Sequence, residues 1–217
     1  MAAFKERVHQ WVWIILFFII AGWFYPPAGL LTIICMLAPV VVAFLKGRVW
    51  CGFFCPRGSF NDLVLAKWSR RRPLPGFLTA TWFRLTFLIL LLGAFTIQII
   101  LAQRNPVAVG TAFWRMICIT TGLTILLGTV YHQRSWCRIC PMGTLAGYAA
   151  GLRPVGNRIQ QVSFKKDRCL DCKLCNKICP LAIPVHTFKA AGRVNDPDCL
   201  KCQACIHSCP QKALYLA

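Results

Sequence analysis

The stretch Cys169–Pro180, CLDCKLCNKICP, determines how the C-terminal part of this chain folds, and Cys199–Pro210, CLKCQACIHSCP, repeats its spacing. Each stretch has three cysteines at intervals of three residues and a fourth directly before proline. Three thiolates on one tight loop can reach three metal ions of a site, whereas another metal ion has to be reached from elsewhere. The spacing therefore predicts centres that hold several metal ions rather than disulfides. Zinc sites are the alternative, but they do not explain two matching sets that both end in Cys-Pro.

These two stretches resemble the ligand pattern of bacterial two-cluster ferredoxins, in which each fourth cysteine ligates the other cluster. The resemblance begins near Ser163 and continues to the end of the chain. It implies a small α+β ferredoxin domain at residues 161–217 that needs metal, because its apolar core is minor. It also implies two [4Fe–4S] clusters, one held by Cys169, Cys172, Cys175 and Cys209, the other by Cys199, Cys202, Cys205 and Cys179.

Residues 1–160 have the composition of a membrane domain. The whole chain is 57% hydrophobic, with 25 Lys and Arg against 6 Asp and Glu. Crossing a bilayer core of about 30 Å takes roughly 20 apolar residues in a helix. Four runs approach that length, which predicts an all-α four-helix transmembrane domain of two duplicated helical hairpins. The predicted spans are Val8–Tyr25, Ala28–Leu45, Leu85–Ala102 and Met116–His132. The first is predicted to be a retained anchor, because bulky residues stand where a signal-peptide cleavage site would need small ones.

The distribution of basic residues predicts the orientation of these spans. Only Pro26-Pro27 joins the first two spans, and the segment between the third and fourth carries just Arg104 and Arg115. Because Lys and Arg are retained on the cytoplasmic side, both termini are predicted to be cytoplasmic, in the inner membrane. A nucleic-acid binder would need a basic face on a soluble fold, so this function is not expected.

A second set of cysteines follows the second and fourth predicted spans. Trp50-Cys51 begins WCGFFCPRGS, and Trp136-Cys137 begins WCRICPMGT. Each motif has a Cys-Pro pair, at Cys55 and Cys140, and leads into a candidate surface helix with Ser59 or Thr144 as its expected N-cap. The membrane part is therefore predicted to be a duplicated unit, with all four thiols on the cytoplasmic face.

The order of these features resembles the NapH/MauN group of ferredoxin-type membrane proteins, and the membrane portions of NosR and of CcoG-type oxidase accessory proteins are similar. The NapH resemblance implies transfer of electrons from membrane quinol into a reductase chain, together with a partner ferredoxin subunit. This chain departs from the pattern in two ways. Its second motif, Cys137-x2-Cys140, is one residue shorter than the first, and it has no large flavin-binding or periplasmic domain.

Three interpretations of Cys51, Cys55, Cys137 and Cys140 remain open. The favoured one is a third [4Fe–4S] cluster at the membrane boundary, because two cysteine pairs supply the four thiolates that one cluster needs. The others are a redox-active or metal-handling set of thiols and a set that only packs. Cys35 and Cys118 stand alone inside predicted spans and are expected to behave as small hydrophobes.

Polar groups at membrane depth are candidates for a quinone site. Gln98, Arg104 and Arg115 would cluster near the external face, but the favoured interpretation is that Arg115 reaches the interface and Gln98 bonds a neighbouring helix. His9 and His132 lie at span ends and no histidine is central, so haem is not expected.

The sequence contains no Walker A motif, dinucleotide-binding glycine fingerprint or catalytic triad. Substrate chemistry is therefore expected to belong to a partner dehydrogenase, reductase or ferredoxin. The favoured function is a membrane electron-transfer or quinol-dehydrogenase subunit between the quinone pool and that partner. The alternatives are an assembly or regulatory redox factor for a metalloenzyme, and a membrane anchor whose clusters are only structural.

Overall fold

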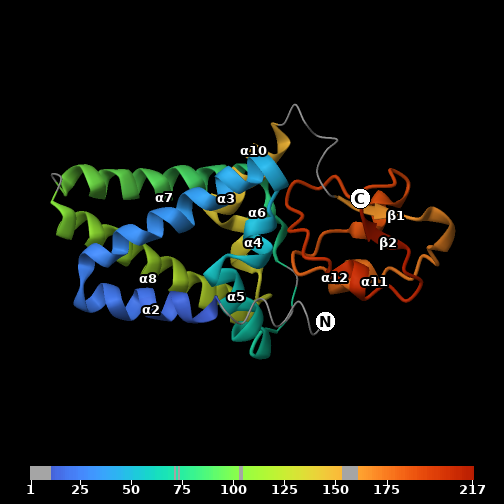
Figure 1. Cartoon of the computed structure of the whole chain (residues 1–217), viewed down its shortest axis with the longest axis horizontal. Helices are drawn as coiled ribbons and strands as arrows, with labels where there is room; N and C mark the ends of the chain where they lie inside the picture. Colours follow the sequence, from blue (N-terminus) through green and yellow to red (C-terminus); the bar gives the residue numbers. More distant parts are fainter. Residues whose placement is uncertain (1–10, 71, 73, 103–104, 153–160) are drawn as a thin grey trace.

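The computed structural model describes residues 11–70, 72, 74–102, 105–152 and 161–217. Long helices form a bundle, and a small C-terminal domain lies at one end of it (Figure 1). The long helices are α2 (Val12–Phe24), α3 (Thr32–Lys46), α7 (Thr81–Leu101) and α8 (Pro106–Val130). Short elements follow or connect them: η1 (Pro26–Leu31), α4 (Val49–Phe53), α5 (Pro56–Leu63), η2 (Leu65–Lys67), α6 (Gly76–Thr79), α9 (Ser135–Ile139) and α10 (Pro141–Gly151).

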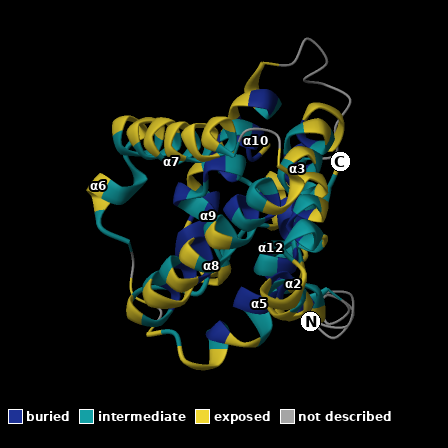
Figure 2. Cartoon of the chain, turned by 90° about the vertical axis from the view of Figure 1, so that its left-hand side faces the viewer, coloured by how far each residue is buried: buried dark blue, intermediate teal, exposed yellow. Residues whose placement is uncertain are grey.

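Among the described residues, three helical segments are long and apolar enough to cross a membrane: Pro26–Lys46, Thr81–Leu101 and Pro106–Val130. Helix α7 has no buried residue, and apolar side chains such as Ile89 (67% exposed) cover its surface, as Figure 2 shows for the outer faces of the bundle. So much exposed apolar surface is unfavourable in water and marks contact with lipid. The chain is therefore a membrane protein.

The described helices differ from the predicted spans at their ends. The prediction Met116–His132 begins too late, because α8 starts at Pro106, where the Asn105 side chain accepts a hydrogen bond from the Val107 amide (3.0 Å) and caps the helix. Helix α2 has only 13 described residues, and the first three positions of the predicted span Val8–Tyr25 lie outside the described residues. The prediction of four spans therefore stays a prediction.

Two glycines let η1 approach helix α8 closely. A Cβ at Gly29 would lie 2.4 Å from the Gly110 carbonyl oxygen, and a Cβ at Gly110 would lie 2.2 Å from that of Pro26. Small residues allow membrane helices to pack backbone against backbone. These contacts fix the turn between α2 and α3 on α8.

We expect Gly110→Ala to destabilise the bundle by about 1–3 kcal/mol, because backbone atoms have to move to admit the methyl group. Thermal unfolding in detergent measures this as a lower midpoint. Gly122→Ala is the matched control on the same helix, since a Cβ there meets nothing within 4 Å. Equal midpoints for the two variants would contradict the packing described.

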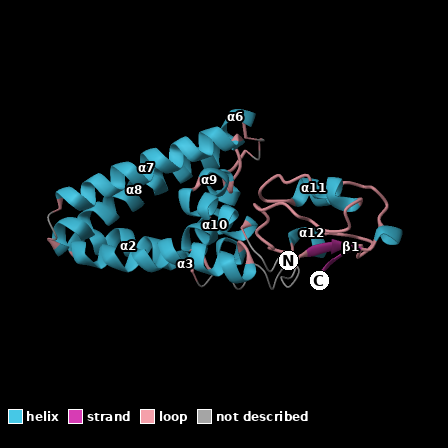
Figure 3. Cartoon of the chain, turned by 90° about the horizontal axis from the view of Figure 1, so that it is seen from above, coloured by secondary structure: helices cyan, strands magenta, loops and turns pink. Residues whose placement is uncertain are grey.

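The C-terminal domain is a small α+β unit. Strands β1 (Val162–Phe164) and β2 (Leu214–Leu216) pair antiparallel beside the short helices α11 (Leu174–Ile178) and α12 (Ala204–His207), and η3 (Lys166–Arg168) and η4 (Val185–Lys189) complete it (Figure 3). Its buried core also takes in Cys51 and Cys137 of the helical part. The domain is thus seated on the end of the bundle that carries the two Cys-Pro motifs.

Candidate metal centres

The two Cys-Pro motifs have the same local structure. In each, a short helix (α4 or α9) contains the first cysteine, and the second cysteine is the extended residue before the next helix (α5 or α10). That helix begins with Pro56 or Pro141, the residue type that suits a first helical position. The expected N-caps Ser59 and Thr144 were therefore wrong, because both lie inside these helices and are buried.

The first motif has one residue more than the second between its two cysteines, and this residue lies directly after the first helix of the motif. Helix α4 ends at Phe53, and Phe54 adds one more residue before Cys55. Helix α9 ends at Ile139, directly before Cys140. The different spacing therefore leaves both second cysteines at the same point, just before a proline.

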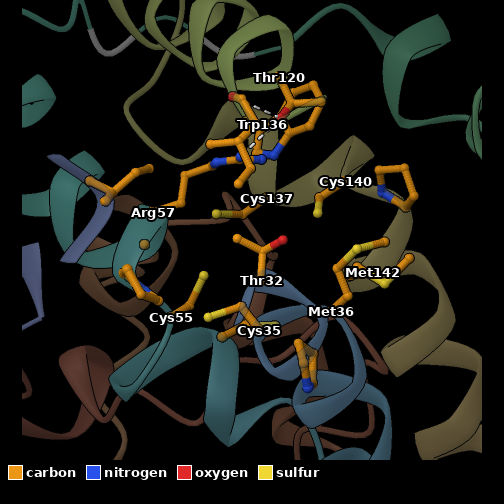
Figure 4. A pocket seen from close by; sticks show the side chains of 18 of the residues that line it. Thr32, Cys35, Met36, Cys55, Arg57, Thr120, Trp136, Cys137, Cys140 and Met142 are labelled. Atoms are coloured by element: carbon orange, nitrogen blue, oxygen red, sulfur yellow. Dashed lines mark hydrogen bonds between the residues drawn. The ribbon is translucent and has the colours of Figure 1, made fainter. Parts of the chain in front are cut away.

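All four cysteines of the motifs line one cavity of about 150 Å³. Figure 4 shows Cys55, Cys137 and Cys140 around this space, with Cys35 of α3 beside them. The structure thus brings together the four predicted thiols and adds Cys35, which the sequence analysis assigned to packing. Four converging thiols are the donor set that one iron–sulfur cluster needs.

Buried hydrogen-bond donors surround this cavity. Arg48 Nε, Arg57 Nε and Trp136 Nε1 belong to residues that line it, and none has a partner among the described atoms. Buried donors are normally paired, so each needs an acceptor. An anionic cluster with acceptor sulfurs in the cavity fits these donors.

Two side chains donate directly to Cys137. Arg134 Nη1 lies 3.7 Å and Asn61 Nδ2 lies 3.9 Å from Cys137 Sγ. The Arg57 guanidinium is held by Thr120 of α8 (2.8 Å) and lies over the Trp136 ring. Donors to sulfur and nearby positive charge stabilise a thiolate and tune a cluster bound to it.

Burial keeps the thiols of Cys51 and Cys55 protonated in the absence of metal. It raises the pKa of Cys55 to about 12, with the nearby Cys51 and Cys137 thiolates adding to the effect. Burial also raises the pKa of Cys51, although Arg48 opposes it. Because a metal ligand has to be a thiolate, metal binding at this site would release protons.

A charged network that the sequence analysis missed links the cavity to the C-terminal domain. Arg134 pairs with Asp62 of α5, while Arg48 and Arg84 pair with Asp198 of the C-terminal domain. Burial alone would raise the pKa of Asp198, but the two guanidinium groups lower it below its ordinary value. One sequence signal was available, since an arginine stands three residues before the first cysteine in both motifs.

The C-terminal domain has two smaller cavities of about 30 Å³ each. Their cysteines divide in the same way as the ligand sets implied by the ferredoxin resemblance. One cavity is lined by Cys169, Cys172, Cys175 and Cys209, and the other by Cys179, Cys199, Cys202 and Cys205.

The loops around these cavities repeat an unusual backbone conformation. Non-glycine residues have positive φ at matching positions of the two stretches: Asp171 and Lys201, Lys173 and Gln203, and Ala182 and Lys212. Turns of this kind direct successive backbone N–H groups to one side and form concave sites for anions, including iron–sulfur clusters. In addition, the Ala213 amide donates to Cys209 Sγ (3.4 Å). The backbone thus fits two anionic clusters.

The Cys199 cavity lies next to the helical part. Leu200 lines this cavity, and its carbonyl oxygen lies 2.7 Å from the position that a Cβ on Gly52 would take. Gly52 stands between Cys51 and Cys55 of the first motif. Arg138 of α9 donates to the carbonyl of Leu181, which lines the same cavity. The Cys169 cavity has no lining residue in the helical part.

The candidate quinone residues do not form a described site. Gln98 and Arg115 are exposed on α7 and α8, and neither lines a described cavity. Arg104 lies outside the described residues, as does His9.

Comparison with known proteins identifies iron–sulfur domains in both parts of the chain. A family model described as a 4Fe-4S binding domain matches residues 28–75 and 114–159, each of which contains one Cys-Pro motif. A 4Fe-4S dicluster domain model matches residues 161–210. No solved structure matches.

Curated relatives match most of the chain. They include the ferredoxin-type proteins NapH of Haemophilus influenzae (28% identical) and of Escherichia coli (27%), each over 81% of the chain. The methylamine utilization ferredoxin-type protein MauN of Paracoccus denitrificans is 28% identical over 82%. The match spans 65%, 64% and 65% of these relatives, so each is longer than the aligned part.

Proposed function

Since the chain is a homologue of the NapH- and MauN-type ferredoxin-type proteins, a family of iron–sulfur electron-transport proteins, we propose that it is a membrane electron-transfer subunit. It passes electrons between the quinone pool and a partner oxidoreductase. It has four spans, with both termini in the cytoplasm, as the distribution of basic residues favours. The partner is a dehydrogenase, a reductase or another ferredoxin.

One observation carries this proposal: Cys51, Cys55, Cys137 and Cys140 converge on one cavity directly beneath the C-terminal domain. These four cysteines hold a third [4Fe–4S] cluster, in addition to the Cys169/Cys172/Cys175/Cys209 and Cys199/Cys202/Cys205/Cys179 clusters. Each cluster, when bound, accepts and donates one electron. Centres at the membrane end and in the exposed domain suit a protein that connects a lipid-soluble donor with a soluble partner.

The side chains around the cavity have separate tasks in this proposal. Arg134 and Asn61 stabilise the Cys137 thiolate, and Arg57 supplies positive charge held by Thr120. Trp136, only 2% exposed, helps to exclude water from the cavity. The nearby positive charge and the donors to sulfur favour the reduced, more negative state of a bound cluster, whereas burial opposes it.

The experiment that tests the function measures metal and electrons on the same sample. Anaerobically purified protein in lipid nanodiscs is expected to contain about twelve irons and as many sulfides per chain. When a quinol is added, the visible absorbance of the clusters should bleach and the EPR signals of reduced clusters should appear.

Two results would count against the proposal, and they affect different parts of it. About eight irons, with all four motif thiols open to alkylation, would exclude the third cluster. Full iron content, with neither reduction of the clusters by quinol nor oxidation of dithionite-reduced clusters by quinone, would exclude the quinone link, and the assembly or regulatory factor would then be the better function.

A further inference from the structure

Two buried arginines each form a hydrogen bond from one Cys-Pro motif to the other. Arg48 stands three residues before Cys51, and Arg134 stands three residues before Cys137. Arg48 Nη2 donates to the carbonyl of Cys137 (2.9 Å), and Arg134 Nη1 donates to the carbonyl of Cys51 (2.9 Å). Their exposed fractions are only 1% and 2%. Each motif thus supplies the arginine that holds the first cysteine of the other.

Matching glycines make room for both arginines. A Cβ at Gly143 would lie 2.5 Å from Arg48 Nη2, and one at Gly58 would lie 2.7 Å from Arg134 Nη1. Each glycine stands three residues after the second cysteine of its motif. The two arginines therefore occupy equivalent places in the two halves of the site.

The carboxylates that pair with these arginines come from different parts of the chain. Asp62, seven residues after Cys55, accepts from Arg134 Nε at 2.8 Å. The residue seven after Cys140 is Gly147, which has no side chain. In its place stands Asp198 of the ferredoxin domain, whose Oδ1 lies 2.6 Å from Arg48 Nη1. A Cβ at Gly147 would lie 3.6 Å from the same Oδ1.

A third arginine fixes the Asp198 carboxylate in this place. Arg84 of α7 donates to Asp198 through both Nη atoms, at 2.8 and 2.9 Å. The Asp198 side chain is only 8% exposed, and the next residue is Cys199. A bidentate, buried ion pair fixes both distance and orientation.

We propose that Asp198 is a positioning residue that docks the ferredoxin domain onto the membrane site, by giving Arg48 the carboxylate that helix α10 lacks at Gly147. Undocking takes the Asp198 carboxylate away from Arg48, and breaking a buried ion pair by removing one partner is strongly unfavourable. The ion pair therefore fixes one docked position of the domain, in which the stretch that begins at Cys199 lies beside the cysteines of the two motifs. The inference concerns docking and does not require quinol to be the electron donor.

The test uses the full-length, cluster-loaded protein in nanodiscs with four variants. Asp198→Asn removes the docking charge, and Gly147→Asp supplies a carboxylate from helix α10 that competes for Arg48 and repels Asp198. Gly147→Ala is the matched control, because a Cβ there makes only ordinary contacts. The fourth variant combines Gly147→Asp with Asp198→Asn.

Docking is read by hydrogen exchange of the backbone amides at residues 48–53, together with the magnetic coupling between reduced clusters in EPR spectra. Asp198→Asn and Gly147→Asp should each speed exchange at 48–53 by about tenfold or more, the factor that corresponds to about 1.4 kcal/mol. Both should weaken the coupling. Gly147→Ala should leave the coupling at the wild-type value. The double variant should stay undocked.

Iron content separates docking from loss of folding. If Asp198→Asn loses ferredoxin iron, Gly147→Asp decides, since it changes no residue of the ferredoxin domain. Wild-type exchange and coupling in Gly147→Asp, or an effect no larger than that of Gly147→Ala, would overturn the proposal. Failure of quinol to reduce the protein would leave both readouts intact, because dithionite can reduce the clusters for EPR.

Discussion

Replacing Cys140 by serine is expected to lower the iron content from about twelve to about eight per chain and to abolish reduction of the ferredoxin domain by quinol. Cys140 follows α9 directly and lines the cavity shared by the two motifs, but it lines neither of the ferredoxin cavities. A serine hydroxyl is a poor replacement for a thiolate ligand, so the membrane centre should be lost while the other two stay. Cys55→Ser should give the same result, because it is the equivalent residue of the first motif.

Cys35→Ser is the matched control for this prediction. Cys35 lines the same cavity but comes from helix α3 rather than from a Cys-Pro motif. It should keep about twelve irons and its response to quinol. If Cys35→Ser and Cys140→Ser lost the same four irons, Cys35 would be a ligand. If Cys140→Ser kept all its iron and its quinol response, the prediction of a third cluster would be wrong.

The sequence was most informative where the spacing of cysteines carries the chemistry. Four thiolates per centre constrain the chain so strongly that the ferredoxin resemblance could divide the eight cysteines of the C-terminal domain into two sets. The same holds for apolar spans, because a bilayer requires long hydrophobic helices. The ends of these elements were less predictable, as the cap at Asn105 and the helix starts at Pro56 and Pro141 show.

What the sequence did not predict are interactions between distant residues. Arg48 and Asp198 are 150 positions apart, and only the fold places the carboxylate where Gly147 lacks one. In both motifs an arginine stands two residues before the tryptophan, but its position in the sequence does not reveal its partner. A long basic side chain near a membrane usually faces the interface, and only burial distinguishes Arg48 and Arg134 from such residues.

The second large effect that we expect is loss of structure in the ferredoxin domain when its metal is removed, because its strands and helices are short. Strands β1 and β2 have three residues each, and helices α11 and α12 have five and four. Helices shorter than about 12 residues are marginal in water without other support. Six non-glycine residues also hold positive φ, a conformation that costs roughly 1–2 kcal/mol per residue.

Removing iron with an oxidant and a chelator is therefore expected to unfold residues 161–217 while the bundle stays folded. Structural zinc supplies about 10–16 kcal/mol to zinc-finger peptides, and we expect the clusters likewise to supply more than this small core can replace. Hydrogen exchange should show protection lost throughout 161–217, and at 48–53 where the domain docks, but kept in α3, α7 and α8. Protection should return when iron and sulfide are added back under reducing conditions. Protection of 161–217 that survives complete loss of iron would show that its apolar core suffices, and the clusters would then serve electron transfer without holding the domain together.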